Sequence, residues 1–295
     1  MTDYGADVGG SGSPFVRKGI VPNLFMWAFL IYFALPLFWL IVASTKTNSS
    51  LFSSAGFWFA HPFNLAENIR GVFSYDNGVF THWLINSAIY AVVSAGGAAV
   101  LATLAGYGFA RYEFSAKRML FGTVLCSIMV PATALAVPTY LLFSKIGFVD
   151  NPLSVIVPSL VSPFGIYLMR IYAEQAVPQS LIDSARIDGA GELVIFARIA
   201  SRLLAPAFVT VVLFTLVATW NNYFLPLVML SNPKYYPLTV GLAQEYSLAN
   251  AGGGVALLYT VVIAGALISI IPLVAAFLLL QRFWQSGLTA GAERY

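Results

Sequence analysis

Six long stretches of this sequence contain no Asp, Glu, Lys or Arg, and they limit the possible folds more than any other feature. They span residues 21–44, 83–110, 119–144, 152–169, 203–230 and 255–280. Each is long enough to cross the hydrocarbon core of a bilayer as a helix, which takes about 20 apolar residues. Only 9% of the chain is charged, against about 25% in soluble domains, which excludes a soluble enzyme or binding module. The sequence predicts an all-α integral membrane protein with six transmembrane helices.

The distribution of Lys and Arg predicts how these helices are oriented. If the N-terminus is cytoplasmic, all but four of the 15 basic residues lie on the cytoplasmic side; the exceptions are Lys46, Arg70, Lys145 and Lys234. Cytoplasmic connections carry an excess of Lys and Arg, so we expect both termini to be cytoplasmic. Residues 1–20 are rich in Gly and Ser and should form a flexible cytoplasmic tail. Residues 21–295 should form the transmembrane domain.

Several kinds of chemistry have no candidate residues here. No acidic, basic or histidine side chain lies deep in a predicted span, as proton-coupled transporters require. His61 and His82 have no second ligand at metal-binding spacing. A P-loop is absent, so this chain should hold no ATP by that motif. The net charge of +3 comes with no basic run longer than two residues, which argues against nucleic-acid binding. We predict no catalytic residue, no metal site and no cofactor in this chain.

The segment 177–200, between the fourth and fifth spans, is the most informative connection. Pro178, followed by Ser180 and Asp183 at capping-box spacing, predicts a helix start. This helix should end near Asp188, and Gly189 supplies a turn. A second helix should then run from residue 192, with an apolar face formed by Leu193, Phe196, Ala197 and Ala200. Such a hairpin either projects into a groove of a partner protein or lies on the lipid headgroups, and composition does not separate these two interpretations.

The segment resembles the EAA loop of ABC importer permeases, whose carbohydrate-type form reads approximately P-x-E-L-x-E-A-A-x-I-D-G-A. The matching positions are Pro178, Leu181, Ala185, Ile187, Asp188, Gly189, Ala190, Phe196, Ile199 and Pro206. Asp183 stands where the family usually has Glu, and Ser184 where it has the first Ala. Ser201 and Arg202 replace the usual Leu-Pro, which puts in doubt how the second helix joins the fifth span.

The resemblance extends from about residue 35 to the C-terminus. Its further motifs are WLINS (83–87), GYGFARY (106–112), MVP (129–131), PFGIYLMR (163–170), TWNNY (219–223) and QRFWQSGLTAGA (281–292). The chain is most similar to the six-span permease subunit of maltose-type sugar importers. This implies the type I ABC importer permease fold and uptake of a sugar or oligosaccharide by alternating access.

The resemblance also implies partners and a location. These are a second homologous permease subunit, two ATPase subunits that carry ATP and Mg²⁺, an extracytoplasmic solute-binding protein, and the lipid of the bacterial cytoplasmic (inner) membrane. In the family this loop couples the permease to the ATPase, a role we carry to Asp183, Ala185, Asp188 and Gly189. Gly189 would permit a positive φ at the turn, and an aspartate could pair with a basic residue of the ATPase. Asp183 could instead serve only as a helix cap.

Two further regions are candidates for contact with the solute. Trp220, Asn221, Asn222 and Tyr223 combine aromatic faces with amides, which suit a sugar, although Trp220 and Tyr223 could equally be packing or interfacial anchors. Residues 231–254 should lie outside the membrane, either as a mobile loop that contacts the binding protein or as a plain connector. Bends near Pro131, Pro138 and Pro163 either shape a pathway or reflect ordinary helix packing.

Two alternatives to the sugar importer stay open. The nearer one is a permease of the same superfamily for another neutral solute. The more distant one is a transporter or scaffold that is not driven by ATP, in which the loop at 177–200 lies only at the membrane surface.

Overall fold

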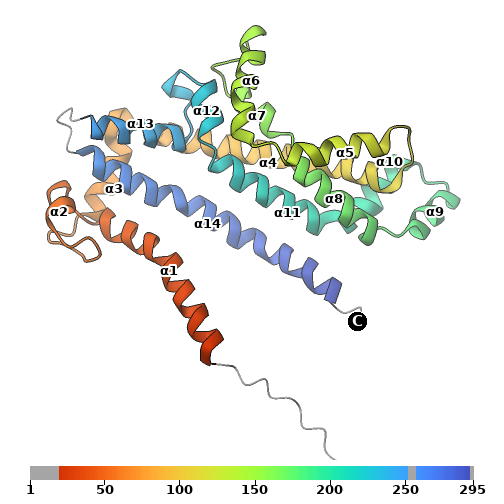
Figure 1. Cartoon of the computed structure of the whole chain (residues 1–295), viewed down its shortest axis with the longest axis horizontal. Coiled ribbons are helices and arrows are strands. Elements are labelled where there is room, and N and C mark those ends of the chain that lie inside the picture. The colour runs from red at the N-terminus through yellow and green to blue at the C-terminus, as the bar shows by residue number, and fades with distance from the viewer. Residues whose placement is uncertain (1–19, 252–256, 293–295) are drawn as a thin grey trace, which may run out of the picture.

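A computed structural model describes residues 20–251 and 257–292, and within these residues every regular element is a helix (Figure 1). The helices are α1 (Ile20–Ser44), α2 (Asn48–Ser53), α3 (Leu65–Ser74), η1 (Tyr75–Gly78), α4 (Val79–Arg111), α5 (Lys117–Ile128), α6 (Ala132–Lys145), α7 (Leu153–Ser159), α8 (Pro163–Ala176), α9 (Gln179–Ile187), α10 (Glu192–Ile195), η2 (Phe196–Ala200), α11 (Ser201–Trp220), α12 (Phe224–Met229), η3 (Pro233–Tyr235), α13 (Leu238–Asn250) and α14 (Leu257–Ala292). The tail predicted for residues 1–20 lies outside the described residues except for Ile20, which begins α1.

Five helical segments of the described chain are long and apolar enough to cross a membrane. They are Pro22–Ser44, Leu65–Arg111, Leu153–Ala176, Glu192–Trp220 and Tyr259–Gln281. The bent pair α5 and α6 supplies a sixth crossing if it is counted as one span. The predicted all-α, multi-span architecture is therefore confirmed, while the side on which each terminus lies stays a prediction.

The third span is not the continuous helix that the sequence predicted. α5 and α6 meet at an angle of 108°, with Met129 and Val130 between them and Pro131 as the N-cap of α6. Proline has no N–H and disfavours helical geometry at the residue before it, so a helix cannot continue through Val130 into Pro131. The bend expected near Pro131 is confirmed. Pro138 lies inside α6 without ending it, and Pro163 occupies the first turn of α8, where a missing N–H costs nothing.

The fifth span begins and ends earlier than predicted. Its helix ends at Trp220, and the short helix α12 follows after residues 221–223. At its other end, α10, the π-helical turn η2 and α11 form one helical run from Glu192 to Trp220. The second helix predicted from residue 192 does begin there, and it continues into the fifth span. Because Ser201 and Arg202 both carry an N–H and neither is proline, nothing interrupts the backbone hydrogen bonds at this junction.

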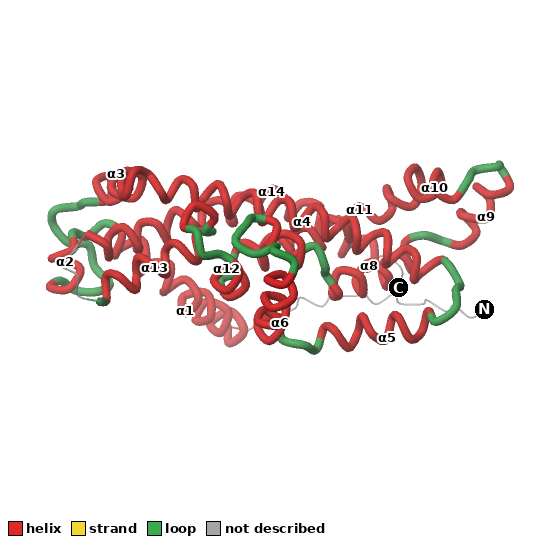
Figure 2. Tube along the Cα trace, turned by 90° about the horizontal axis from the view of Figure 1, so that it is seen from above, coloured by secondary structure: helices red, strands yellow, loops and turns green. Residues whose placement is uncertain are grey.

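Helices α4, α8 and α11 pack against one another and form the body of the molecule (Figure 1). Gly106 of α4 lies so close to α8 that a Cβ there would be 2.5 Å from Cβ of Met169. Helices α9 and α10 lie at one end of the molecule, here named the α9 end, while α2 and α13 lie at the opposite end (Figure 2). α1 extends away from the body, α5 lies along its side, and α6 projects away from it next to α12.

The segment 231–251 is largely folded rather than a free loop. The side chain of Asn86 donates hydrogen bonds to the carbonyls of Lys234 (2.8 Å) and Tyr236 (3.0 Å), and Tyr90 donates to the carbonyl of Tyr235 (2.8 Å). α13 then packs against α4 and α14. These contacts favour a structured connector over a mobile loop up to residue 251, and residues 252–254 lie outside the described residues. Contact with a binding protein stays a prediction.

Candidate functional site

The turn after α9 has the backbone geometry that the sequence predicted. Gly189 has φ +81°, a conformation that glycine adopts without steric cost. The N–H of Gly189 donates to the carbonyl of Arg186 (3.0 Å), and the N–H of Ala190 donates to the carbonyl of Ala185 (2.9 Å). These two bonds form a Schellman motif, which ends α9 and satisfies two of its last carbonyls. The prediction of a positive φ at Gly189 is confirmed.

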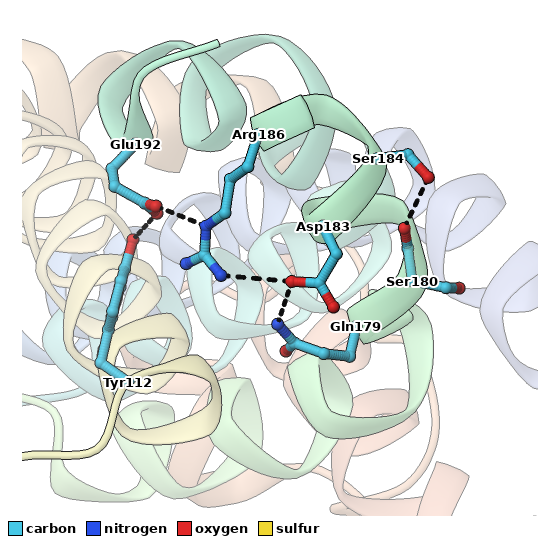
Figure 3. Close-up of polar contacts among 7 residues, drawn as sticks. All are labelled: Tyr112, Gln179, Ser180, Asp183, Ser184, Arg186 and Glu192. Carbon is cyan, nitrogen blue, oxygen red and sulfur yellow. Dashed lines mark hydrogen bonds and ion pairs between the residues drawn. The ribbon is translucent and has the colours of Figure 1, made fainter. Parts of the chain in front are cut away.

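The start of α9 differs from the prediction. Pro178 is the N-cap and makes no side-chain cap bond, so the capping box of Ser180 and Asp183 is wrong. Each residue lies two positions beyond its place in a capping box, which would use residues 178 and 181. Asp183 Oδ1 instead accepts hydrogen bonds from Gln179 Nε2 (3.0 Å) and Arg186 Nη1 (3.3 Å) (Figure 3).

A chain of charged and polar contacts fixes α9 against the ends of α4 and α10. Arg186 Nε donates to Glu192 Oε1 (2.7 Å), and the Tyr112 hydroxyl donates to Glu192 Oε2 (2.7 Å) (Figure 3). The hydrogen bond to Glu192 raises the pKa of the Arg186 guanidinium. Burial, and next the hydrogen bond to Glu192, raises the pKa of the Tyr112 phenol. Arg186 therefore stays charged and Tyr112 stays a neutral donor, so the contacts persist over the physiological pH range.

The two faces of α9 have different roles. Ile182 and Ala185 are buried against this chain's own core, beside Tyr107 and Met169. Asp183, Asp188 and Gly189 are exposed. Ala185 therefore packs inside this chain, whereas the other three predicted coupling residues face outward.

Two apolar side chains beside the turn are the most exposed part of this end. Ile187 is 86% exposed and Leu193 is 85% exposed. The predicted apolar face is divided: Leu193 and Ala197 are exposed, whereas Phe196 is half-buried and Ala200 is buried in this chain's own core. The sequence analysis did not identify Ile187 as a surface residue, because an isoleucine at helical spacing usually occupies a buried position.

Removing the Glu192 carboxylate should loosen α9 without unfolding the chain. In a Glu192→Ala variant, Arg186 and Tyr112 lose their shared acceptor, and an exposed ion pair of this kind contributes little to the overall stability of the chain. Hydrogen–deuterium exchange of the amides of residues 182–190 should rise about two- to fivefold. Glu67→Ala, which removes the exposed Arg70 pair on α3, is the control and should leave these amides unchanged. Unchanged protection in Glu192→Ala would show that packing alone holds α9.

A cavity of about 1120 Å³ lies where the broken helices meet. Its walls are the end of α5, α6, the junction of α7 and α8, the end of α11, and residues 221–225. None of the lining residues carries a charge. Hydroxyl and amide side chains are numerous among them: Ser127, Thr133, Thr139, Ser159, Ser162, Thr215, Thr219, Asn221 and Asn222. The cavity can donate hydrogen bonds to a neutral polar molecule and accept them from it.

Three of the four predicted pathway residues line this cavity. Asn221, Asn222 and Tyr223 do so because α11 ends at Trp220 and the chain turns there before α12. Trp220 is placed in the core instead, where its Nε1 donates to the carbonyl of Ser269 (3.2 Å). The hydroxyls of Thr139 and Ser162 were missed. Single Ser and Thr residues in apolar helices give no sequence signal, because they also bond to their own backbone, as Thr139 does to Leu135.

No group of three or more His, Cys, Asp or Glu side chains in the described part of the chain could hold a metal ion.

Comparison with known proteins gives consistent results. Residues 98–286 match the family model described as the binding-protein-dependent transport system inner membrane component. The chain is 30% identical to the arabinooligosaccharides transport system permease protein AraQ of Bacillus subtilis (strain 168), over 93% of this chain and 95% of that protein. It is 27% identical to the lactose transport system permease protein LacG of Rhizobium radiobacter, over 90% of this chain and 92% of that protein.

A solved structure shares the fold. It is a chain from the crystal structure of a bacterial ABC transporter involved in the import of the acidic polysaccharide alginate, with a TM-score of 0.78 and 22% identity. The match covers 92% of this chain and 100% of that one. With the helical architecture, the family match over most of the chain and relatives aligned almost from end to end, this multi-pass membrane protein belongs to the family of binding-protein-dependent transport system inner membrane components and is a transport permease subunit.

Proposed function

We propose that this chain is the permease subunit of an ATP-driven importer that takes up a neutral sugar or oligosaccharide by alternating access. An extracytoplasmic binding protein would deliver the sugar, and the importer would sit in the bacterial cytoplasmic (inner) membrane. A second homologous permease and two ATPase subunits would complete it. The chain would carry no catalytic residue, and ATP and Mg²⁺ would bind the ATPase subunits. The observation that carries the sugar proposal is the uncharged, hydroxyl- and amide-lined cavity in a chain of this family.

The cavity suits a sugar for a physical reason. A buried polar group costs free energy unless it is hydrogen-bonded, so a polyhydroxylated solute needs many donors and acceptors along its path. The lining supplies them from α6, from the α7–α8 junction and from Asn221 and Asn222 at the end of α11. An anionic solute would need a cation there, and the lining residues include none. The permeases for arabinooligosaccharides and lactose to which the chain is similar support the same substrate class.

The turn after α9 supports the proposed docking of an ATPase subunit. Ile187 and Leu193 are exposed apolar side chains on either side of a rigid Gly189 turn, and buried apolar anchors dominate the energetics of protein interfaces. Exposed Asp183 and Asp188 flank them and can pair with basic residues of the partner. Because Arg186, Glu192 and Tyr112 fix α9 to the body, a movement of the ATPase would be transmitted to α4 and α11.

Reconstitution tests the substrate class. The chain, its second permease and its ATPase are placed in proteoliposomes, and ATP hydrolysis is measured with the binding protein and a panel of solutes. The panel holds arabino-oligosaccharides, lactose, an acidic oligosaccharide and neutral solutes that are not sugars. Stimulation by a neutral sugar alone is expected. Stimulation only by another neutral solute would replace the substrate class, and the absence of any ATPase in the complex would overturn the importer itself.

Two threonines provide a matched test of the cavity. Thr139 lines the cavity and is half-buried, whereas Thr123 is exposed and does not line it; both bond to the carbonyl four residues earlier (2.7 and 3.1 Å). Thr139→Val, like Asn221→Ala, should raise the KM for sugar uptake about 2- to 10-fold, because one hydrogen bond contributes roughly 0.5–1.5 kcal/mol. Thr123→Val should leave KM unchanged. Equal effects of the two Thr→Val changes would place the sugar path elsewhere.

A further inference from the structure

A second hollow of about 610 Å³ lies between α5 and α8, close to the α9 end of the molecule. Its lining differs from that of the sugar cavity because it combines cations with apolar and aromatic side chains. The lining residues are Glu113, Phe114, Ala116, Lys117, Arg118, Phe121, Gly122, Leu125 and Arg170. Three of these nine residues are basic and one is acidic. We name this hollow the α5–α8 groove.

The three cations of the groove keep unused hydrogen-bond donors. Lys117 Nζ bonds only Glu113 Oε1 (2.8 Å), so two of its three N–H groups are available. Arg170 bonds Glu174 through Nε (2.9 Å), which leaves both terminal nitrogens available. Arg118 makes no hydrogen bond or ion pair with any described residue. These donors converge on one hollow, and Arg and Lys side chains in such an array match the oxygens of a phosphate group.

Aromatic stacking holds one of these cations in place. The guanidinium carbon of Arg170 lies 3.8 Å from the centre of the Phe121 ring. A cation over an aromatic face is attracted by the ring and loses side-chain freedom before any ligand arrives. Arg170 is thus fixed both by Phe121 and by Glu174, and its terminal nitrogens remain free. The groove needs little rearrangement to bind an anion.

The groove continues into an apolar surface of α5. Leu125 and Ile128 follow Phe121 on the same face of the helix, at i+4 and i+7, and both are exposed. A Cβ at Gly122 would meet no atom within 4 Å, so the middle of α5 is open. A ligand with a phosphate at one end and hydrocarbon at the other matches this order of cations followed by apolar residues. Phospholipids have that chemistry, and basic pockets between helices at a membrane surface bind their headgroups.

We propose that the α5–α8 groove binds an anionic membrane phospholipid, with the phosphate on Arg118, Lys117 and Arg170 and an acyl chain along α5. The site lies apart from the sugar cavity and does not depend on which solute is transported. A free phosphate would use the same cations but would gain nothing from Phe114, Leu125 or the exposed face of α5. The lipid is therefore the occupant that the whole groove fits.

The test compares lipid binding to the purified full-length chain in mild detergent by native mass spectrometry. Phosphatidylglycerol is added to the wild-type chain and to Arg118→Gln and Lys117→Gln/Arg118→Gln variants. Among the described residues Arg118 makes no hydrogen bond or ion pair, so the single variant removes charge without removing a contact. The Lys117 side chain is only 16% exposed, so the double variant is compared with the single one, while Glu113, which loses Lys117, is 90% exposed. Each basic residue near a membrane surface contributes about fivefold to the binding of anionic lipid, so the double variant should bind on the order of 25-fold less.

Controls separate the groove from general charge and the lipid from its headgroup. Lys145→Gln/Lys234→Gln removes the same net charge from two exposed positions outside the groove and should bind lipid like the wild type. Phosphatidylcholine should bind weakly to all forms, and glycerol phosphate at millimolar concentration should not displace phosphatidylglycerol. Equal binding by the wild type and the double variant, equal binding of phosphatidylcholine, or displacement by glycerol phosphate would each overturn the proposal.

Discussion

A Gly189→Trp variant is expected to insert into the membrane and fold but to lose the binding of the ATPase subunit that we propose as the wild type's partner. Gly189 has φ +81° and lies on an exposed turn where an added Cβ would meet no atom of this chain within 4 Å. A residue with a Cβ pays about 1–2 kcal/mol in this conformation. The indole would also cover the surface beside Ile187 and Leu193. Together these effects should lower ATPase recovery at least tenfold and abolish sugar-stimulated ATP hydrolysis.

The chain offers a matched control for this change. Gly147, in the turn after α6, has φ +68° and no atom within 4 Å of an added Cβ, so Gly147→Trp carries the same strain and the same bulk. It lies away from the α9 end and should retain the ATPase. Gly189→Ala separates the backbone strain from the bulk of the indole and should fall between the wild type and Gly189→Trp. Normal ATPase recovery together with normal coupled uptake in Gly189→Trp would remove the coupling role from this turn.

The second large effect is expected in folding, at Gly106. A Cβ at this position would lie 2.5 Å from Met169 Cβ and 2.8 Å from the backbone nitrogen of Arg170. Since backbone atoms of α8 cannot move aside alone, Gly106→Leu must separate α4 from α8. Overpacking of a tight core costs typically 1–3 kcal/mol, which outweighs the roughly 1 kcal/mol that a helix gains when glycine is replaced. The variant should show a lower thermal midpoint and less monodisperse protein in gel filtration.

Gly108 is the control for Gly106, because it lies two residues further along the same helix. A Cβ there would meet nothing within 4 Å. Gly108→Leu should therefore keep the helix-forming gain without the clash, and its thermal midpoint should equal or exceed that of the wild type. If both variants lose stability equally, helix flexibility rather than the α4–α8 contact is what Gly106 provides.

The transmembrane architecture could be predicted because it follows from composition along short windows. A stretch of about 20 apolar residues free of charge must satisfy its backbone internally, and the helix is the structure that does so within one segment. The breaks were harder to place. Pro131 ends one helix and begins another, whereas Pro138 stays inside α6. The same residue type gives both results because neighbouring helices decide whether a freed carbonyl finds a partner.

The candidate site was predicted in part. A positive φ at Gly189 follows from the local sequence, because a glycine directly after a helix favours the Schellman geometry. The capping box was wrong because Pro178 sets the helix start by its own fixed φ. Trp220 and Asn221 are neighbours in sequence, yet one lies in the core and the other lines the cavity. Which of the two residues lies in the core depends on where α11 ends. Nothing in the sequence marks that end, because apolar residues continue beyond it.

The sequence by itself determined that the chain crosses the membrane as helices, that a helix–glycine turn separates the fourth and fifth spans, and that six long apolar stretches carry no charge. Each of these depends only on local composition and local backbone freedom. Only the tertiary structure decided which side of α9 is exposed, with Ala185 buried and Ile187 outside. It also brought Thr139 and Asn221 to the same cavity. Thr139 and Asn221 line one cavity because helices distant in sequence pack against one another. Close packing decides which faces touch, and it can do so only once all the helices are present.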